Sequence, residues 1–221
     1  MRYLIVCLLL CTGTASYADN VMRFTTSSSV DAFPEVVEMF STIYSRLGYR
    51  IEIVKLPERR SMYEAGKRDW IDGELARVKE AEPLLPEHIR VPVPVSNVAV
   101  SAFVKSLNFE SNGWRSLKPY KLGSLRGIIA TEKNLVGFNT LEAGSPSQLL
   151  EMLDRGRIQI AIMPRPMGEF ALMTLPYNIR ILAPPIDTFT LYHYVNKKHQ
   201  AMVPQITQIM SELTGAMIEM E

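Results

Sequence analysis

The sequence predicts an α/β fold of two similar lobes, in which each lobe has a mostly parallel sheet flanked by helices. Short apolar segments alternate with amphipathic helical segments in the order β-α-β-α-β, and a second α/β unit follows. The stretch AGKRDWIDGELAR, residues 65–77, is partly repeated as DRGRIQIAIMPR at residues 154–165. Each copy ends a helix at Gly, continues as a strand and finishes on an arginine. Ligands of open α/β sheets bind at the carboxyl ends of strands, so facing lobes would bring Arg77 and Arg165 towards one gap.

Helical and strand periods locate the elements of the first unit. Pro34 opens a helix whose apolar residues recur at helical spacing, and Gly48 ends it in a left-handed conformation that glycine tolerates. A second, shorter helix ends at Gly66. The expected elements are a strand at 22–25, a helix at 34–47, a strand at 50–56, a helix at 58–65 and a strand at 69–75.

The second unit follows a proline-rich segment, EPLLPEHIRVPVPVSN at residues 82–97, which we expect to cross the surface as an irregular loop. Further on, Ser145 can cap a helix that has Pro146 in its first turn and Gln148 to complete a capping box. The expected elements are strands at 98–104, 135–141 and 157–163, a strand within 120–128 that leads into a Gly-flanked turn, a helix at 145–156, and a last helix with Ile206, Ile209, Met210 and Leu213 on one face.

The charge balance limits the classes of partner. The 221 residues are 47% apolar, which is enough for a substantial core, and 24 basic residues stand against 23 acidic ones. Binding to bulk nucleic acid or to an anionic membrane surface usually needs a basic excess, so we expect neither.

The first eighteen residues predict an export signal. Arg2 provides the positive end, residues 3–11 form a short apolar stretch, and small residues stand at Ser16 and Ala18. The apolar stretch is too short to span a bilayer. We therefore expect cleavage after Ala18 and a periplasmic location, with an uncleaved anchor or a lipoprotein attached at Cys11 as alternatives.

Cleavage would remove every thiol. Cys7 and Cys11 are the two cysteines of the chain, and both lie in the expected signal. A mature chain without them has no disulfide, no cysteine nucleophile and no cysteine metal ligand. It also has no membrane-spanning segment once the signal is gone, and we expect a monomer.

Several stretches together resemble a known family. They are LPERRSMYEAGKRDWIDGELARV, IRVPVPV, WRSLKPYKLGSLRGI, LLEMLDRGRIQIAI and YHYVNKKH. Their order and spacing are similar to those of the bacterial extracellular solute-binding proteins of family 3, over essentially all of residues 20–221. Members of that family are periplasmic, two-lobed proteins of the type II periplasmic binding protein fold, and many deliver amino acids or related solutes to ABC importers. This chain resembles a compact variant of them.

The resemblance implies a domain organisation. The chain would cross between lobes twice, near 103–105 and near 185–188, through a double-crossover hinge. Lobe 1 would comprise residues 19–104 and the return segment 188–221, and lobe 2 would comprise residues 105–187. A ligand would sit in the cleft between the lobes and close it by hinge motion.

The resemblance also implies positions that bind the ligand. These are the loop at 27–33, Arg77 after the third strand, and the turn Arg126-Gly127-Ile128 in lobe 2. Ile128 stands where the family often has Thr, and AIMPR lacks the Asp with which many members hold a ligand ammonium. These departures favour a carboxylate ligand without that amine over an ordinary α-amino acid.

Four arginines are candidates for carboxylate binding, because a guanidinium offers two charge-assisted hydrogen bonds in a planar fork. They are Arg60, Arg77, Arg126 and Arg165. The alternative for each is an ordinary ion pair, since Glu58, Glu64, Asp72 and Glu74 lie nearby in the sequence.

Aromatic and hydroxyl side chains are further candidates. Phe33, Trp70 and Tyr192 could stack on a ligand, although core packing is the alternative. Ser28 and its neighbours at 27 and 29 could donate hydrogen bonds, although a serine run after a strand is often a plain turn.

Catalysis has little support in the sequence. The three histidines, His88, His193 and His199, show no metal-ligand spacing, and neither a GxSxG motif nor a glycine-rich phosphate loop is present. Glu74 beside Arg77 could act as a general acid or base, but an ion pair is the ordinary alternative. We therefore expect no catalytic residue, no metal and no cofactor.

The sequence thus predicts a periplasmic binding protein for a small, carboxylate-bearing solute that serves an ABC importer or a membrane sensor. Two alternatives stay open. One is a dehydratase acting on a cyclic prephenate-like acid, since some proteins similar to this family have that activity. The other is a protein that presents its ligand to a membrane sensor.

Overall fold

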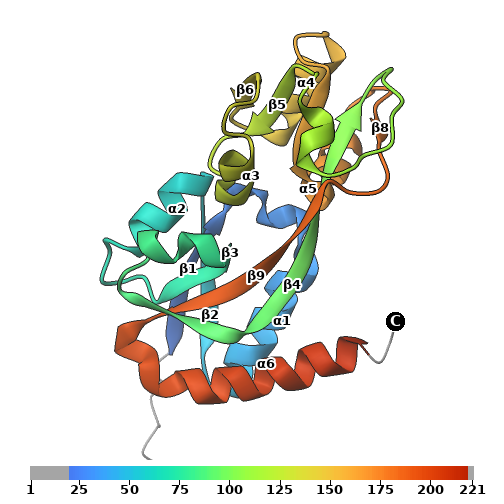
Figure 1. Cartoon of the computed structure of the whole chain (residues 1–221). Helices are drawn as coiled ribbons and strands as arrows, with labels where there is room; N and C mark the ends of the chain where they lie inside the picture. The colour runs from blue at the N-terminus through green and yellow to red at the C-terminus, as the bar shows by residue number, and fades with distance from the viewer. Residues whose placement is uncertain (1–19, 219–221) are drawn as a thin grey trace, which may run out of the picture.

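One sheet runs through both halves of the molecule in the computed structural model, which describes residues 20–218. Its strand order is β2-β1-β3-β9-β4-β7-β5-β6, and β8 pairs with β4 outside this path. Figure 1 shows two lobes that are joined by the long strands β4 and β9. Lobe 1 contains β1–β3, α1, α2 and α6, and lobe 2 contains β5–β8 and α3–α5.

Lobe 1 is built on three parallel strands. β1 pairs with β2 along its whole length and with β3 on its other side. The helices α1 and α2 connect these strands, as in other parallel sheets. The elements are β1 (Val21–Ser27), α1 (Pro34–Arg46), β2 (Arg50–Leu56), α2 (Glu58–Ala65), β3 (Gly73–Val78) and, at the end of the chain, α6 (Val203–Ile218).

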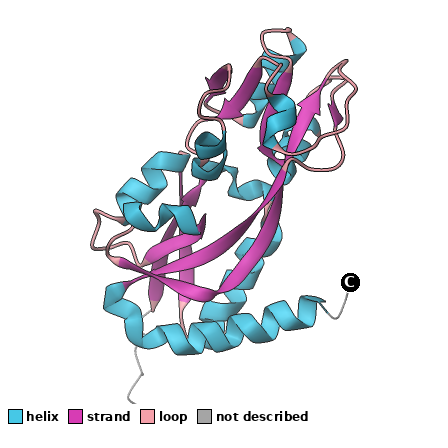
Figure 2. Cartoon of the chain, in the orientation of Figure 1, coloured by secondary structure: helices cyan, strands magenta, loops and turns pink. Residues whose placement is uncertain are grey.

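The two joining strands are antiparallel. β4 (His88–Val104) pairs with β9 (Asp187–Asn196) from the pair His88 and Asn196 to the pair Val100 and Asp187. From Val100 to Phe103, β4 also pairs with β7 of lobe 2. Both strands therefore carry the chain between lobes, and Figure 2 shows them as the continuous link.

Lobe 2 repeats the parallel arrangement on a smaller scale. β5 lies between β6 and β7 and is parallel to both. Its elements are β5 (Leu122–Leu125), α3 (Ile129–Asn134), β6 (Thr140–Ala143), α4 (Pro146–Asp154), β7 (Ile160–Pro164), α5 (Arg165–Leu172) and β8 (Arg180–Ile181). Four short 3-10 helices complete the fold: η1 (Ser28–Ala32), η2 (Lys79–Leu84), η3 (Trp114–Leu117) and η4 (Lys197–Met202).

The helix boundaries confirm the signals in the sequence. Pro34 stands in the first turn of α1, and Gly48 after its end has a φ of 80°. At α4 the Ser145 hydroxyl accepts a hydrogen bond from the Gln148 backbone N–H, at 3.2 Å. The Gln148 side chain in turn accepts one from the Gly144 N–H, at 2.7 Å. The reciprocal bonds satisfy N–H groups that have no partner within the helix.

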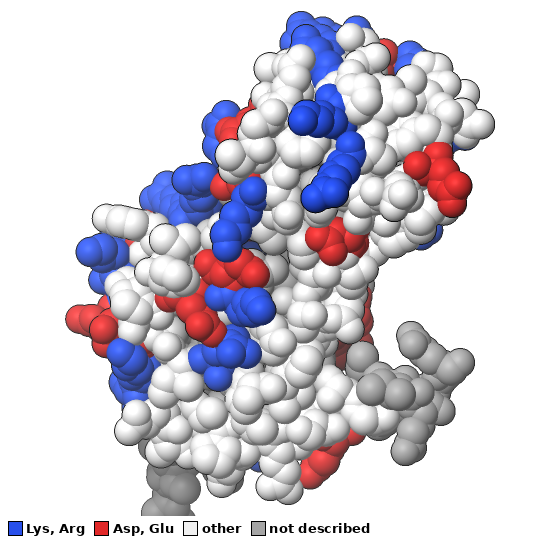
Figure 3. Space-filling model, viewed as in Figure 1, with Lys and Arg blue, Asp and Glu red and all other residues white. Residues whose placement is uncertain are grey.

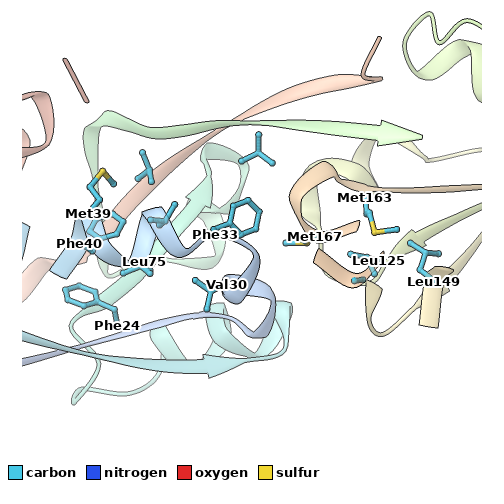
Figure 4. Packing of buried hydrophobic residues seen from close by; sticks show 14 of the residues in the cluster. Phe24, Val30, Phe33, Met39, Phe40, Leu75, Leu125, Leu149, Met163 and Met167 are labelled. Atoms are coloured by element: carbon cyan, nitrogen blue, oxygen red, sulfur yellow. The ribbon is translucent and has the colours of Figure 1, made fainter. Parts of the chain in front are cut away.

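The main hydrophobic cluster extends through both lobes. It includes Phe24 and Phe40 in lobe 1 and Leu149 and Met163 in lobe 2, all fully buried. Figure 4 shows Val30 and Phe33 on the lobe 1 side and Met167 on the side of lobe 2 that faces them. The lobes are therefore in apolar contact at this point.

Three expectations about secondary structure are wrong. Residues 82–97 are not an irregular crossing, because β4 begins at His88; its register with β9 shifts on both sides of Pro94, and such irregularities accommodate proline in a sheet. The strand expected at 69–75 forms at Gly73–Val78, and the one expected at 135–141 forms only at Thr140–Ala143. Helices α3 and α5 are short, so they carry too few periodic positions to stand out in the sequence.

The expected export signal lies outside the described residues. Within residues 20–218, no helix combines the length and the apolar character that a bilayer crossing requires.

Gly73 generates a prediction about the sheet. It pairs with Phe24 of β1 and with Val195 of β9, and a Cβ there would collide with the Tyr194 carbonyl and the Phe24 ring. We expect Gly73→Ala to lower the free energy of unfolding by about 1–3 kcal/mol, measured by urea denaturation.

Gly215→Ala in α6 is the matched control, because a Cβ there meets nothing within 4 Å. It should leave stability unchanged or raise it by about 0.5–1 kcal/mol, since alanine favours a helix over glycine. A Gly73→Ala protein as stable as the wild type would contradict the close packing of β3 between β1 and β9.

Candidate functional site

A cavity of about 100 Å³ lies between the lobes. Lobe 1 provides the end of β1, the segment from η1 into α1, and parts of α2 and β3. Lobe 2 provides residues 127–130, Pro164 and Met167, while β4 and β9 contribute Val98, Phe189 and Leu191. The volume is roughly seven to ten times the ~10–15 Å³ that one water molecule needs, so it suits a small molecule.

Most of the wall is apolar. Val30, Phe33 and Met62 line it from lobe 1, and Ile128 and Met167 line it from lobe 2. Such walls favour hydrocarbon surface, at roughly 25 cal/mol for each Å² removed from water.

Ser27, Glu58 and Arg77 of the cavity wall belong to one buried network, which we name the Arg77 cluster. It comprises Thr25, Ser27, Glu58, Ser61, Glu74 and Arg77. The Arg77 side chain, only 12% exposed, lies 3.2 Å from a Glu58 carboxylate oxygen and 2.9 Å from one of Glu74. It also donates a hydrogen bond to the Ser61 hydroxyl.

The two acids of the cluster have further partners. Thr25 donates its hydroxyl proton to a Glu74 oxygen at 2.7 Å, and the Ser27 hydroxyl bonds to Glu58. Glu74 is fully buried, whereas Glu58 lines the cavity. The cluster thus ties β1, α2 and β3 together beneath the cavity.

An irregularity in β3 brings Glu74 and Arg77 together. Residues three apart in a regular strand point to opposite faces. The register of β3 against β9 shifts between Glu74, opposite Tyr194, and Arg77, opposite Tyr192. A bulge of this kind redirects the side chains that follow it, which allows Arg77 to approach Glu74.

Burial raises the pKa of Glu74 to about 7. Removal of the carboxyl from water is the main cause; the Arg77 charge and the Thr25 hydrogen bond lower the pKa, and the nearby Glu58 charge raises it. With Glu58 ionised, the cluster is close to neutral below this pKa and carries about one negative charge above it.

One donor of Arg77 stays unpaired. Among the described residues, the Arg77 Nε is buried and has no hydrogen-bond partner. A buried N–H without a partner costs about 1–3 kcal/mol, and an acceptor on a ligand would remove that cost only after the cluster rearranged to let it reach this atom.

A polar contact closes the junction beside α2. A side chain at Gly127 would collide with Glu58 and approach Arg59, and Gly127 has a φ of 92°. The Gly127 N–H donates to Glu132 at 2.6 Å, and the other Glu132 oxygen pairs with Arg59 at 2.7 Å. Glycine is required here because the two lobes approach each other so closely.

The structure brings several of the residues selected from the sequence to this site, including Ser27, Gly127 and Ile128. Arg77 and Phe33 line the cavity, and Glu74 lies directly behind Arg77. Arg77 is also held in ion pairs, so the predicted place at the cavity and the alternative of an ion pair both hold for this side chain.

The other three arginines lie outside the cavity. Each is exposed and paired with an acid of its own lobe: Arg60 with Glu64, Arg126 with Glu142 and Arg165 with Glu169. Arg165 is the first residue of α5 and turns along that helix to the residue four positions on. The similar ends of the two repeated stretches therefore place only one guanidinium at the cavity.

The remaining candidates also lie elsewhere. Ser28 lines a separate hollow beside Phe170. The ring of Tyr192 packs under the Arg90 guanidinium, 4.6 Å from the ring centre. Trp70 is 50% exposed and joins neither the core nor the cavity.

Several lining residues were not selected from the sequence. Glu58 was considered only as a partner for arginines, and Met62, Met167, Phe189 and Leu191 read as ordinary core positions. Alternation along β9 marks 189 and 191 as sharing one face, but only the fold shows that this face meets the cavity.

The surface visible in Figure 3 carries charges of both signs. In Figure 3, basic and acidic side chains are mixed beside the junction, and much of the visible surface of lobe 1 is neutral. Within residues 20–218, no group of three or more His, Cys, Asp or Glu residues is placed to hold a metal ion.

Comparison with known proteins gives a structural likeness without a sequence match. No family model and no curated protein matches the sequence. Arginine-bound truncated ArgBP from T. maritima superposes with a TM-score of 0.71 at 14% identity, covering 88% of this chain and 96% of that chain.

Two further structures are similar. A histidine kinase sensor domain described as similar to periplasmic binding proteins has a TM-score of 0.72 at 13% identity, covering 89% of this chain and 91% of that chain. The substrate-binding protein of an amino acid ABC transporter has a TM-score of 0.67 at 13% identity, with 89% and 94% covered. The chain therefore has the two-lobed α/β fold of periplasmic binding proteins.

Proposed function

We propose that the protein binds a small carboxylate-bearing solute in the cavity between its lobes, as a member of the extracellular solute-binding proteins of family 3. The observation that carries this proposal is Arg77, which lines an otherwise largely apolar interlobe cavity and retains a buried, unpaired N–H. Charge-assisted hydrogen bonds to a carboxylate are the strongest that a guanidinium makes.

The approach of a carboxylate changes the partners of Arg77. Its charge is already balanced by Glu58 and Glu74, so an added anion would leave the cluster with excess negative charge. Two changes would reduce this excess negative charge beside Arg77. Glu58, at the first turn of α2, moves away from the guanidinium, or Glu74 takes up a proton. The second is inexpensive near neutral pH because the pKa of Glu74 is about 7.

The proposal extends to location and to the lobes. We propose export by the signal at residues 1–18, a periplasmic location, and delivery of the solute to an ABC importer or a membrane sensor. The lobes would be 19–104 with 188–221, and 105–187, closing about β4 and β9. Pairing of β4 with β7 from Val100 onwards supports a junction on that strand a few residues before 104.

An enzymatic role has weaker support. Glu74 has the raised pKa of many catalytic acids, but its carboxyl is fully buried behind Arg77 and bonded to Thr25. It does not line the cavity, so it has no direct path to a bound solute. Solute binding therefore accounts for the arrangement better than a dehydratase does.

A thermal-shift screen with amino acids, organic acids and polyamines tests the proposed function. A solute at a hundred times its Kd should stabilise the protein by about 2.7 kcal/mol. Absence of any stabilisation by the carboxylates would contradict the proposal.

Arg77→Lys should weaken binding of the solute found in that screen by about tenfold or more, because an ammonium keeps the charge but loses the planar fork. Isothermal titration calorimetry measures the change, and urea denaturation checks that the variant folds. Arg165→Lys is the matched control, since Arg165 is exposed and pairs with Glu169, and it should bind as the wild type does. Equal losses in both variants would remove Arg77 from the binding site.

Binding should also depend on pH. An anion beside Arg77 raises the pKa of Glu74 above its value of about 7, so the complex holds more protons than the free protein. Affinity should therefore fall as pH rises above about 7, by up to about tenfold for each pH unit. Calorimetry between about pH 6 and about pH 8 measures it.

Glu74→Gln is the control for the pH dependence, because it keeps the shape of the side chain and removes the titration. Its affinity should be nearly constant over the same range. An affinity that rises with pH in the wild type would contradict proton uptake by Glu74.

A further inference from the structure

We propose that the solute is an apolar monocarboxylate without an α-ammonium group, a class that includes short branched-chain and arylalkanoic acids. This inference rests on the proposed function and concerns the same cavity. It follows from the unequal distribution of polar groups between the two lobes.

The polar side chains of the cavity all come from lobe 1. They are Thr26 and Ser27 at the end of β1, Glu58 of α2 and Arg77 of β3. Lobe 2 contributes Gly127, Ile128, Ile129, Ala130, Pro164 and Met167, none of which has a side-chain oxygen or nitrogen. A carboxylate would therefore point to lobe 1 and a hydrocarbon body to lobe 2.

An α-ammonium group has no free acidic partner in this arrangement. It carries three N–H donors and a full charge, and burial without an acceptor is costly. Glu58 is the carboxylate that lines the described cavity, and it is bonded to Ser27 and Arg77. Glu74 is fully buried behind Arg77 and bonded to Thr25.

The apolar body fits the rest of the wall. Phe33, Met62 and Leu191 together with Ile128 and Met167 make up much of the apolar wall. The volume, roughly that of seven to ten water molecules, accommodates a solute of this size.

Matched pairs that differ only in the α-ammonium group test the inference. They are isocaproate and leucine, isovalerate and valine, and hydrocinnamate and phenylalanine, titrated into the full mature protein by calorimetry. At least one acid should bind about tenfold or more tightly than its amino-acid partner. Isocaproamide should bind more weakly than isocaproate, because it lacks the charge that Arg77 pairs with.

The outcomes separate the inference from the proposed function. If an amino acid binds as tightly as its matched acid or more tightly, the inference is wrong and solute binding stands. The same holds if only polar amino acids such as arginine or glutamine bind. If none of these acids and no amino acid binds, both are wrong.

A variant in lobe 2 provides an independent test. Ile128→Asp would place an acceptor on the wall that lacks one, and Ile128→Asn is the matched uncharged control. Ile128→Asp should shift the ratio of leucine to isocaproate affinity by about tenfold or more in favour of leucine, and Ile128→Asn by less. An unchanged ratio in a folded Ile128→Asp protein would contradict the claim that a missing acceptor excludes the ammonium.

Discussion

The buried ion pair between Arg77 and Glu74 is the interaction on which the cavity depends. A buried charge is tolerated only when it is paired, and removal of one partner typically costs about 3–5 kcal/mol. Here the pair is completed by Thr25 from β1 and by Glu58 and Ser61 from α2. Three of the elements that form the lobe 1 side of the cavity, β1, α2 and β3, are therefore held by one polar network, and the guanidinium is fixed in place before any solute arrives.

The cluster also determines what the cavity can select. Two acids already contact Arg77, so the site presents a directed guanidinium without a net positive charge. Lobe 2 adds an apolar wall and approaches α2 so closely at Gly127 that a side chain there has no room. The charged side chains of the cavity thus lie in lobe 1, and the apolar wall of lobe 2 excludes water and packs against hydrocarbon. This division differs from a site in which both lobes hold charged groups of an amino acid.

Much of the fold follows from local signals, and the site follows from them only in part. Pro34, Gly48 and Ser145 mark helix ends that the structure confirms, because caps act through neighbouring residues. The strand within residues 82–97 could not be predicted from local signals, because the long-range pairing of β4 with β9 overrides the local effect of the prolines. Arg60, Arg126 and Arg165 show the same limit, because the direction of a long side chain depends on acids within reach in the folded lobe.

The bulge between Glu74 and Arg77 is the feature that the sequence pattern predicts least well, because the two side chains of a regular strand would point to opposite faces. Their contact also gives the central claim its most direct test, which is a carbon-13 NMR titration of the Glu74 carboxyl in the folded protein. The account predicts a pKa of about 7 in the free protein and a higher value once a carboxylate solute is bound. A carboxyl that titrates at the ordinary value for glutamate, ~4.3, and does not respond to the solute would contradict it.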